Sequence, residues 1–151
     1  MSLKQGDIIL LAEDSHDDLV LMRYAFAKAG IKNRVHEVSD GQEAIDYLQG
    51  AGAYSDRRRH PLPCVIITDL KMPRVDGLAF LKWLYHRPEF HRVPKLVMST
   101  SGVDTDRRQA ADLGACAYFV KPAQLDELVR VVSEIDEHWI SAHCPLVPRE
   151  S

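Results

Sequence analysis

Short apolar segments alternate with amphipathic segments along this chain, and this alternation limits the fold more than any other feature. Short segments that fit strands cover residues 8–12, 34–38, 63–68, 95–98 and 117–120, and residues 8–12 are a continuous apolar run. Helices are expected over about residues 17–29, 40–49, 77–86, 104–113 and 124–140, and apolar residues recur at helical spacing in the first and the last of them. Continuous apolar runs are typical of strands covered on both faces, and the strand–helix repeat favours parallel strands with right-handed crossovers. The pattern predicts a doubly wound α/β fold, in which a five-stranded parallel sheet lies between two layers formed by five helices.

Local signals mark where several of these segments begin and end. Ser15 fits the N-cap of the first helix, and Gly30 fits its stop. Asp40 with Glu43 resembles a capping box that opens the second helix. Residues 50–63 form the one long irregular stretch, which we interpret as a surface loop with a solvated run of three arginines.

Composition excludes several classes of protein. The 151 residues suffice for one domain with a core, and the net charge of -3 gives no basic footprint for nucleic acid. No run approaches the roughly 20 apolar residues that a membrane span needs, and the first residues lack the apolar region of a signal peptide. Cys64, Cys116 and Cys144 form neither a disulfide framework nor a CxxC metal motif. We therefore expect a reduced, cytoplasmic protein in which Cys64 is a small buried hydrophobe.

Polar side chains follow four of the predicted strands at their carboxyl ends. Asp69 directly follows the apolar third strand. The others are Glu13 and Asp14 after the first strand, Ser99 after the fourth and Lys121 after the fifth. In open α/β sheets, ligands bind outside the carboxyl ends of the strands, so we expect these groups to meet at one site.

These residue types together suit phosphoryl chemistry. Three carboxylates repel one another unless a cation lies between them, and carboxylate oxygens with open positions for water suit Mg²⁺ best. A hydroxyl and an ammonium group suit the remaining oxygens of a phosphoryl group, whose transfer depends on positioning and charge neutralisation. Asp69 is then the candidate nucleophile, because carboxylates form acyl phosphates.

The same residues belong to a longer pattern. Its motifs are Glu13-Asp14, Asp69 followed by Met72-Pro73, Asp76-Gly77, Ser99, and Tyr118 ahead of Lys121-Pro122. With these motifs, residues 7–140 resemble the receiver domain of two-component response regulators. The resemblance implies the flavodoxin-like strand order 2-1-3-4-5. It also implies a signalling protein that is not an enzyme, apart from self-catalysed phosphotransfer and autodephosphorylation.

The resemblance assigns a role to each residue. Asp69 would accept a phosphoryl group from a sensor histidine kinase and become 4-aspartylphosphate. The implied Mg²⁺ ligands are Glu13, Asp14, Asp69 and the backbone carbonyl of Lys71, and no other cofactor is implied. Ser99 would hydrogen-bond the phosphoryl group, Lys121 would pair with it, and Ser99 with Tyr118 would form the switch. The peptide bond between Lys121 and Pro122 would be cis, which the chemistry of proline permits.

A narrower resemblance concerns partners and domain organisation. The long loop after the second helix, residues 74–77 and a C-terminal helix with His138-Trp139 look like the single-domain regulators that serve phytochrome-type kinases. Such proteins commonly form homodimers through the fourth helix, fifth strand and fifth helix. We expect residues 1–140 to form the receiver domain and residues 141–151 a non-helical tail without an output domain. Output would be protein contact or phosphorelay, with no nucleic acid and no membrane.

The last predicted helix carries more apolar surface than a one-sided helix needs. Its core-facing stripe is Leu125, Leu128, Val132, Ile135 and Trp139, flanked by Val129, Val131 and Ile140. This arc spans roughly 180°, against the ~100° of a one-sided surface helix. The excess would face either a second subunit or the C-terminal tail.

Other interpretations stay open at this level. An aspartate-dependent Mg²⁺ phosphohydrolase usually has a second acid two residues beyond its nucleophile, where this chain has Lys71. A flavin-binding protein would have hydroxyl groups and glycine in the loop after the first strand, where this chain is acidic. A receiver-like docking module that is never phosphorylated would not need the whole set of polar groups. For Tyr118 the alternative is ordinary packing, and Asp17 and Asp18 are interpreted as favourable charges in the first turn of a helix.

Overall fold

A parallel sheet of five strands forms the centre of the molecule. The structure, a computed structural model, describes residues 7–144 of the chain. The strands are β1 (Ile9–Ala12), β2 (Val35–Val38), β3 (Val65–Thr68), β4 (Lys95–Ser99) and β5 (Ala117–Val120). They lie in the order β2-β1-β3-β4-β5, and every neighbouring pair is parallel. The predicted fold class and strand order are therefore confirmed.

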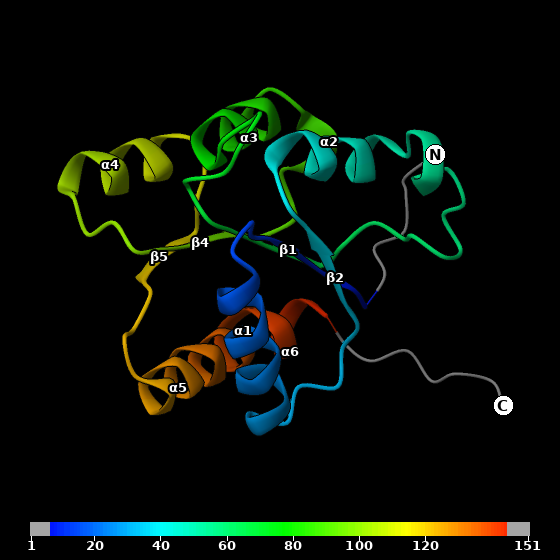
Figure 1. Ribbon diagram of the computed structural model, residues 1–151. Coiled ribbons are helices and arrows are strands. Elements are labelled where there is room, and N and C mark those ends of the chain that lie inside the picture. The colour runs from blue at the N-terminus through cyan, green and yellow to red at the C-terminus, as the bar shows by residue number, and fades with distance from the viewer. Residues whose placement is uncertain (1–6, 145–151) are drawn as a thin grey trace, which may run out of the picture.

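Helices cover both faces of this sheet. The main helices are α1 (His16–Lys28), α2 (Gly41–Gln49), α3 (Gly77–Tyr85), α4 (Asp104–Asp112) and α5 (Leu125–Ile135). The short elements are η1 (Gly52–Tyr54), η2 (Pro88–Phe90), the π-helical turn η3 (Asp136–Ile140) and α6 (Ser141–His143). Figure 1 shows α1, α5 and α6 on one face and α2, α3 and α4 on the other. Over residues 7–144, no helix is long and apolar enough to cross a membrane.

Each face of the sheet has its own hydrophobic core. Alternate strand residues point to opposite faces, so Leu10 and Ile66 join the core under α2, α3 and α4. Ile9 and Ile67 join the core under α1 and α5. All residues of β1 and β3 are buried. This burial explains why these strands are continuous apolar runs in the sequence.

The predicted helix signals are present in the structure. The Ser15 side chain accepts a hydrogen bond from the Asp18 amide at 3.2 Å, and Asp40 accepts one from the Glu43 amide at 2.8 Å. The Glu43 carboxylate accepts a hydrogen bond from the Ser39 amide at 3.2 Å, and Ser39 precedes the N-cap Asp40 by one residue. Gly30 follows α1 with a φ of 79°, a left-handed conformation that glycine adopts freely. Both predicted N-caps and the predicted stop are confirmed.

The basic run in the 50–63 loop is not uniformly solvated, which corrects our interpretation. Arg58 and Arg59 are exposed, but Arg57 is half-buried. The Arg57 guanidinium donates to the Tyr47 carbonyl at 2.7 Å and to the Leu48 carbonyl at 2.5 Å. Because the last carbonyls of a helix have no partner within the helix, Arg57 acts as a C-terminal cap of α2.

We predict that Arg57→Ala lowers the free energy of unfolding by about 1–3 kcal/mol, because helix carbonyls lose a charged donor. Urea unfolding measures the change. Arg59→Ala is the matched control, since Arg59 is exposed, and it should change stability by no more than about 0.5 kcal/mol. Equal urea midpoints for the two variants would contradict the capping role.

The C-terminal helix continues further than predicted. The expected helix over residues 124–140 is α5 followed by η3, and α6 then extends it through Ser141–His143. The prediction of a non-helical tail from residue 141 is therefore wrong for residues 141–143, while residues 145–151 lie outside the described residues. Trp139 packs edge-on against Phe119 of β5, with ring centroids 6.1 Å apart. This contact and the burial of Ile140 hold the widened turn against the sheet.

The apolar excess of this helix is covered within the chain. Leu128 and Val132 share a core with Met22 and Phe26 of α1, and Val129 packs against the edge of this core. Of the flanking residues that we expected to face a second subunit or the tail, Ile140 is buried, and Val129 and Val131 are half-buried against this core. The wide apolar arc gives no support to a dimer.

Two of the three cysteines form a disulfide, contrary to the reduced state that we inferred. Cys64 is bonded to Cys144, and only Cys116 is free. Cys64 is fully buried, as predicted, but as half of a cross-link. The pair is 80 residues apart in the sequence. The number and local spacing of the cysteines therefore gave no signal of this disulfide. The C-terminal helix brings Cys144 back to the start of β3, and this path is visible only in the folded chain.

Candidate functional site

The carboxyl ends of β1 and β3 place two carboxylates side by side. The Glu13 amide donates to the Val38 carbonyl and the Asp69 amide to the Ala12 carbonyl, both at 2.9 Å. These bonds extend the parallel ladders one residue past the strands. Glu13 and Asp69 are buried, with exposed fractions of 3% and 8%. The sheet therefore fixes both carboxylates in a partly desolvated position.

Asp14 completes an acidic cluster. Carboxylate oxygens of Glu13, Asp14 and Asp69 all lie within 4.8 Å of one another, and Asp14 is exposed. Hard oxygen donors at this spacing suit a divalent cation such as Mg²⁺, and the exposed side leaves room for the waters that Mg²⁺ retains. The donor set thus fits the predicted metal. Lys71, whose backbone carbonyl is the fourth predicted ligand, lines the adjoining cavity.

Lys121 reaches into this cluster from the end of β5. Its ammonium group contacts Glu13, lies 2.7 Å from Asp18 Oδ2 and lies 3.0 Å from Asp69 Oδ2. Burial raises the pKa of Glu13 to about 7, although the Lys121 hydrogen bond opposes this rise. Burial would lower the pKa of Lys121, but hydrogen bonds to Asp18 and Glu13 outweigh it and raise the pKa. Lys121 therefore stays charged and partly neutralises the carboxylates.

The Asp69 carboxylate is held in a defined orientation. Its Oδ1 accepts a hydrogen bond from the Leu70 amide at 2.7 Å, which leaves Oδ2 facing Lys121. An open cavity of about 450 Å³ adjoins the cluster and is lined by Asp14, Leu70, Lys71, Met72, Pro73 and Asp76. A donor molecule can therefore approach the cluster from solvent.

The two predicted switch residues lie close in the fold. Ser99 is fully buried at the end of β4, and its hydroxyl accepts a hydrogen bond from the Ser101 amide at 3.2 Å. The Tyr118 hydroxyl donates to the Ser101 carbonyl at 2.6 Å, and the Arg107 guanidinium lies 4.9 Å from the Tyr118 ring centroid. Both residues therefore contact the loop after β4.

The backbone connects this loop to Lys121. The Lys121 amide donates to the Ser99 carbonyl at 2.7 Å, which links the ends of β4 and β5. The peptide bond between Lys121 and Pro122 is trans, because no cis bond occurs in the described residues. The expected cis bond is wrong, and the trans form is the one that X-Pro bonds generally prefer.

Sequence reasoning missed two contributors to the site. Asp18, interpreted as a helix charge, pairs with Lys121. A usable signal existed in its position, because Asp18 lies in the first turn of α1, which begins directly after the carboxyl end of β1. Arg74 donates to both carboxylate oxygens of Asp40, at 2.8 and 3.1 Å, and so ties the loop after β3 to the start of α2. Nothing local to Arg74 indicated this partner, 34 residues away.

A doubly wound sheet with an acid cluster and a lysine at its carboxyl edge defines a class of phosphoacceptor signalling domains. The family model described as "Response regulator receiver domain" matches residues 9–133. This chain belongs to the response regulator receiver domain family. Receiver domains of this family are phosphoacceptor signalling proteins that interact with sensor histidine kinases and bind Mg²⁺ or Mn²⁺ at an acidic cluster.

Two curated relatives agree with this family placement. "Response regulator Rcp1" of Synechocystis sp. (strain ATCC 27184 / PCC 6803 / Kazusa) is 30% identical over 133 residues, covering 88% of each protein. The "Probable methanogenesis regulatory protein FilR2" of Methanothrix harundinacea (strain 6Ac) is 34% identical over 136 residues, covering 88% of this chain and 83% of that protein.

Solved structures agree with this placement. The phosphorylated cyanobacterial phytochrome response regulator RcpA superposes with a TM-score of 0.83 and 34% identity, over 91% of this chain and 96% of that one. The Mn(2+)-bound form of Rcp1 superposes with a TM-score of 0.79 and 28% identity, over 95% and 99%. These neighbours confirm the flavodoxin-like fold and the narrower resemblance to phytochrome response regulators.

Proposed function

We propose that this chain accepts a phosphoryl group on Asp69 in a Mg²⁺-dependent reaction with a sensor histidine kinase. The observation that supports this most is the cluster of Glu13, Asp14 and Asp69 within 4.8 Å, with Lys121 Nζ 3.0 Å from Asp69 Oδ2. The family and the similarity to phytochrome response regulators support the same function and favour a phytochrome-type kinase as partner. We further propose that the chain acts in the cytoplasm and signals by protein contact or phosphorelay.

Each residue takes one part of the transfer. An Asp69 carboxylate oxygen attacks phosphorus, forming an O–P bond while the P–N bond to the donor histidine breaks and the imidazole leaves with its electron pair. Lys121 then pairs with the phosphoryl oxygens, and the Ser99 hydroxyl donates to one of them. Glu13, Asp14, Asp69 and the Lys71 carbonyl would hold Mg²⁺, which supplies charge neutralisation when bound.

The decisive experiment measures phosphoryl uptake from a small acyl phosphate. With Mg²⁺, we expect incorporation of up to one phosphoryl group per chain, seen by intact mass and removed by hydroxylamine because it is an acyl phosphate. With a chelator in place of Mg²⁺ we expect no uptake. Uptake that is equal with and without the metal would exclude the proposed site, and absence of uptake under both conditions would exclude the function.

The pKa of Glu13 gives this reaction a pH dependence. Burial raises that pKa to about 7 in the metal-free protein, so Glu13 must lose its proton to bind a cation. Mg²⁺ affinity should therefore rise with pH, by up to about tenfold per unit below this pKa, and level off above it. Calorimetric titration from about pH 6 to about pH 8 measures the trend. In Glu13→Gln the affinity should be lower and should lose this dependence, and a flat profile in the unaltered chain would contradict the assignment.

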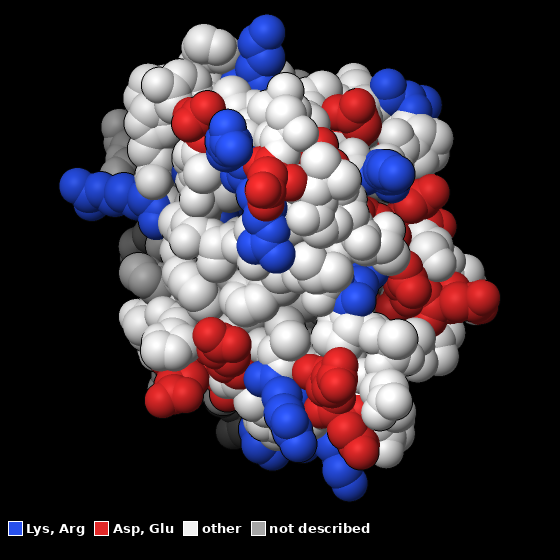
Figure 2. Space-filling view, turned by 90° about the vertical axis from the view of Figure 1, so that its left-hand side faces the viewer, with Lys and Arg blue, Asp and Glu red and all other residues white. Residues whose placement is uncertain are grey.

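We also propose a homodimer through α4, β5 and α5. Figure 2 shows this side of the molecule, where a mostly uncharged band crosses the middle and side chains of both charges lie above and below it. Val103 and Val120, next to α4 and on β5, are 57% and 38% exposed. An apolar centre with a charged rim is the usual anatomy of a protein interface.

Light scattering with and without phosphorylation tests the dimer. We expect Val120→Lys to shift the mass toward the monomer. The matched control is Val20→Lys, because Val20 is also exposed but lies on α1, and it should leave the mass unchanged. A monomer under all conditions would remove the dimer.

A further inference from the structure

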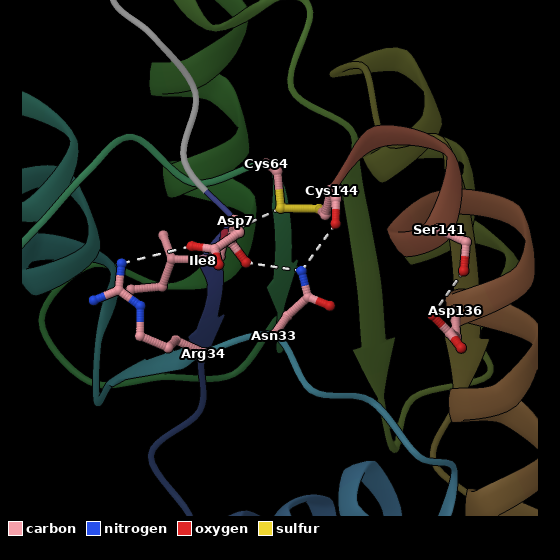
Figure 3. Close-up of a disulfide and its surroundings, with 8 residues drawn as sticks. All are labelled: Asp7, Ile8, Asn33, Arg34, Cys64, Asp136, Ser141 and Cys144. Carbon is pink, nitrogen blue, oxygen red and sulfur yellow. Dashed lines mark hydrogen bonds and ion pairs between the residues drawn. A yellow bond between two sulfur atoms is a disulfide. The ribbon is translucent and has the colours of Figure 1, made fainter. Parts of the chain in front are cut away.

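The disulfide lies at the opposite end of the sheet from the phosphoacceptor. Cys64 precedes the four residues of β3, and Asp69 follows them. Cys64 and Cys144 have exposed fractions of 0% and 2%, and their Cα atoms are 5.3 Å apart. This separation is usual for a disulfide. Figure 3 shows the bond joining the start of β3 to the end of the C-terminal helix.

Four segments that are distant in the sequence meet at this bond. The side-chain nitrogen Nδ2 of Asn33, after α1, donates to the Asp7 carbonyl at 2.9 Å and to the Cys144 carbonyl at 3.0 Å (Figure 3). The Cys144 amide donates to the Ile140 carbonyl at 2.7 Å, which keeps it in register with η3. The cross-link therefore closes a junction of the residues before β1, the α1–β2 loop, the start of β3 and the C-terminal helix.

The surroundings suit the thiol form as well as the disulfide. The Cys64 sulfur lies 3.2 Å from the Ile8 carbonyl oxygen, where a thiol would donate a hydrogen bond. Both cysteines are packed in the apolar core under α1 and α5. Two neutral thiols can stay buried there, because a free cysteine behaves as a small hydrophobic residue. Reduction therefore leaves a junction that can remain packed.

The two cysteines differ in their position relative to a surface cavity. Cys144 lines a cavity of about 310 Å³ together with Lys32, Asn33 and Ser141, whereas Cys64 does not. Cys144 also directly follows α6, which is a single short helical turn after the π-helical turn η3. Helix ends of this kind open locally at low cost. A small reagent can therefore reach Cys144 without unfolding of the sheet.

We propose that Cys64 and Cys144 form a reversible oxidation site whose reagents are low-molecular-weight disulfides of the glutathione class. The Cys144 thiolate attacks the small disulfide, forming a mixed disulfide and releasing one small thiol that takes up the proton. The Cys64 thiolate then attacks the Cys144 sulfur, forming the internal bond and releasing a second small thiol. Two protein thiols are oxidised while one small disulfide is reduced to two thiols. The oxidised chain has its C-terminal helix clamped covalently to β3, and the reduced chain holds it by packing alone.

Equilibration of the full chain in glutathione and glutathione disulfide mixtures tests the chemistry. After quenching with an alkylating reagent, intact mass and peptide mapping should show Cys116 either alkylated or carrying one small thiol, and never bonded to another cysteine of the chain, because it is free and exposed. Cys64 and Cys144 should become protected together, in one two-electron step that reverses on reduction. Alkylation of all three cysteines at every ratio would overturn the proposal. So would a glutathione adduct that stays on Cys144.

The clamp is tested by comparing the oxidised and the reduced forms of the unaltered chain. This comparison does not depend on whether a variant folds. Because the bond closes a long loop, we expect reduction to lower Tm by roughly 5–15 °C. Amide exchange at residues 136–144 should become faster at the same time. Cys116→Ser should keep this difference, and Cys144→Ala should abolish it. Equal Tm and exchange in the oxidised and reduced chains would overturn the clamp.

Discussion

Asp69→Asn is expected to abolish phosphoryl uptake from a small acyl phosphate, whereas the unaltered chain takes up as much as one group. Asparagine preserves the size of the side chain and can still accept the Leu70 amide hydrogen bond at Oδ1. It removes the anionic oxygen that attacks phosphorus, and a neutral amide is a far weaker nucleophile. Uptake is measured by intact mass in the presence of Mg²⁺, with peptide mapping of any phosphorylated residue.

The control for this variant must perturb the same charge cluster without touching the acceptor. Asp18→Asn meets this need, because Asp18 contacts Lys121 as Asp69 does but lies on α1. It should retain uptake of a phosphoryl group. If Asp69→Asn were phosphorylated as fully as the control, the acceptor would be another carboxylate, and the assignment would be wrong.

Gly77→Ala is expected to destabilise the fold by about 3 kcal/mol or more, through overpacking of backbone against backbone. A Cβ at this position would lie 2.0 Å from the Asp69 carbonyl oxygen and 2.6 Å from the Leu70 Cα. The Gly77 amide also donates to the Leu70 carbonyl at 2.8 Å, so the start of α3 cannot move away without losing this bond. Any shift that relieves the clash displaces Asp69, so phosphoryl uptake should fall as well.

Urea unfolding measures this effect, and Gly102→Ala is its control. A Cβ on Gly102 would have the Val120 side chain as its nearest neighbour, at 3.7 Å, which is an ordinary van der Waals contact. Its stability should change by no more than about 0.5 kcal/mol. A Gly77→Ala protein as stable as this control would mean that the approach of α3 to the acceptor is looser than the structure indicates.

The chain's local patterns were sufficient for the fold class and for the membership of the acid cluster, whereas the strand order was expected from the family resemblance. Burial of β1 and β3 on both faces requires apolar residues at successive positions, so these strands are visible in the sequence. Asp40 caps the helix that directly follows it, and such contacts between near neighbours need no tertiary information. Because parallel strands bring their carboxyl ends to one edge, the positions of Glu13 and Asp69 followed from the strand assignments.

Contacts between distant segments were decided only by the tertiary structure. Asp18 and Lys121 are 103 residues apart, and their pairing depends on how α1 approaches the end of β5. Arg57 caps α2 because its loop folds back over the helix end. The C-terminal helix rises by about 1.5 Å per residue, so it is long enough to run along the sheet and end beside β3. This path brings Cys144 to Cys64. Local sequence determines which residues form a strand, a helix or a cap, because those energies arise between near neighbours. Which side chains meet across the chain depends on how the helices pack on the sheet, and only the folded molecule determines that.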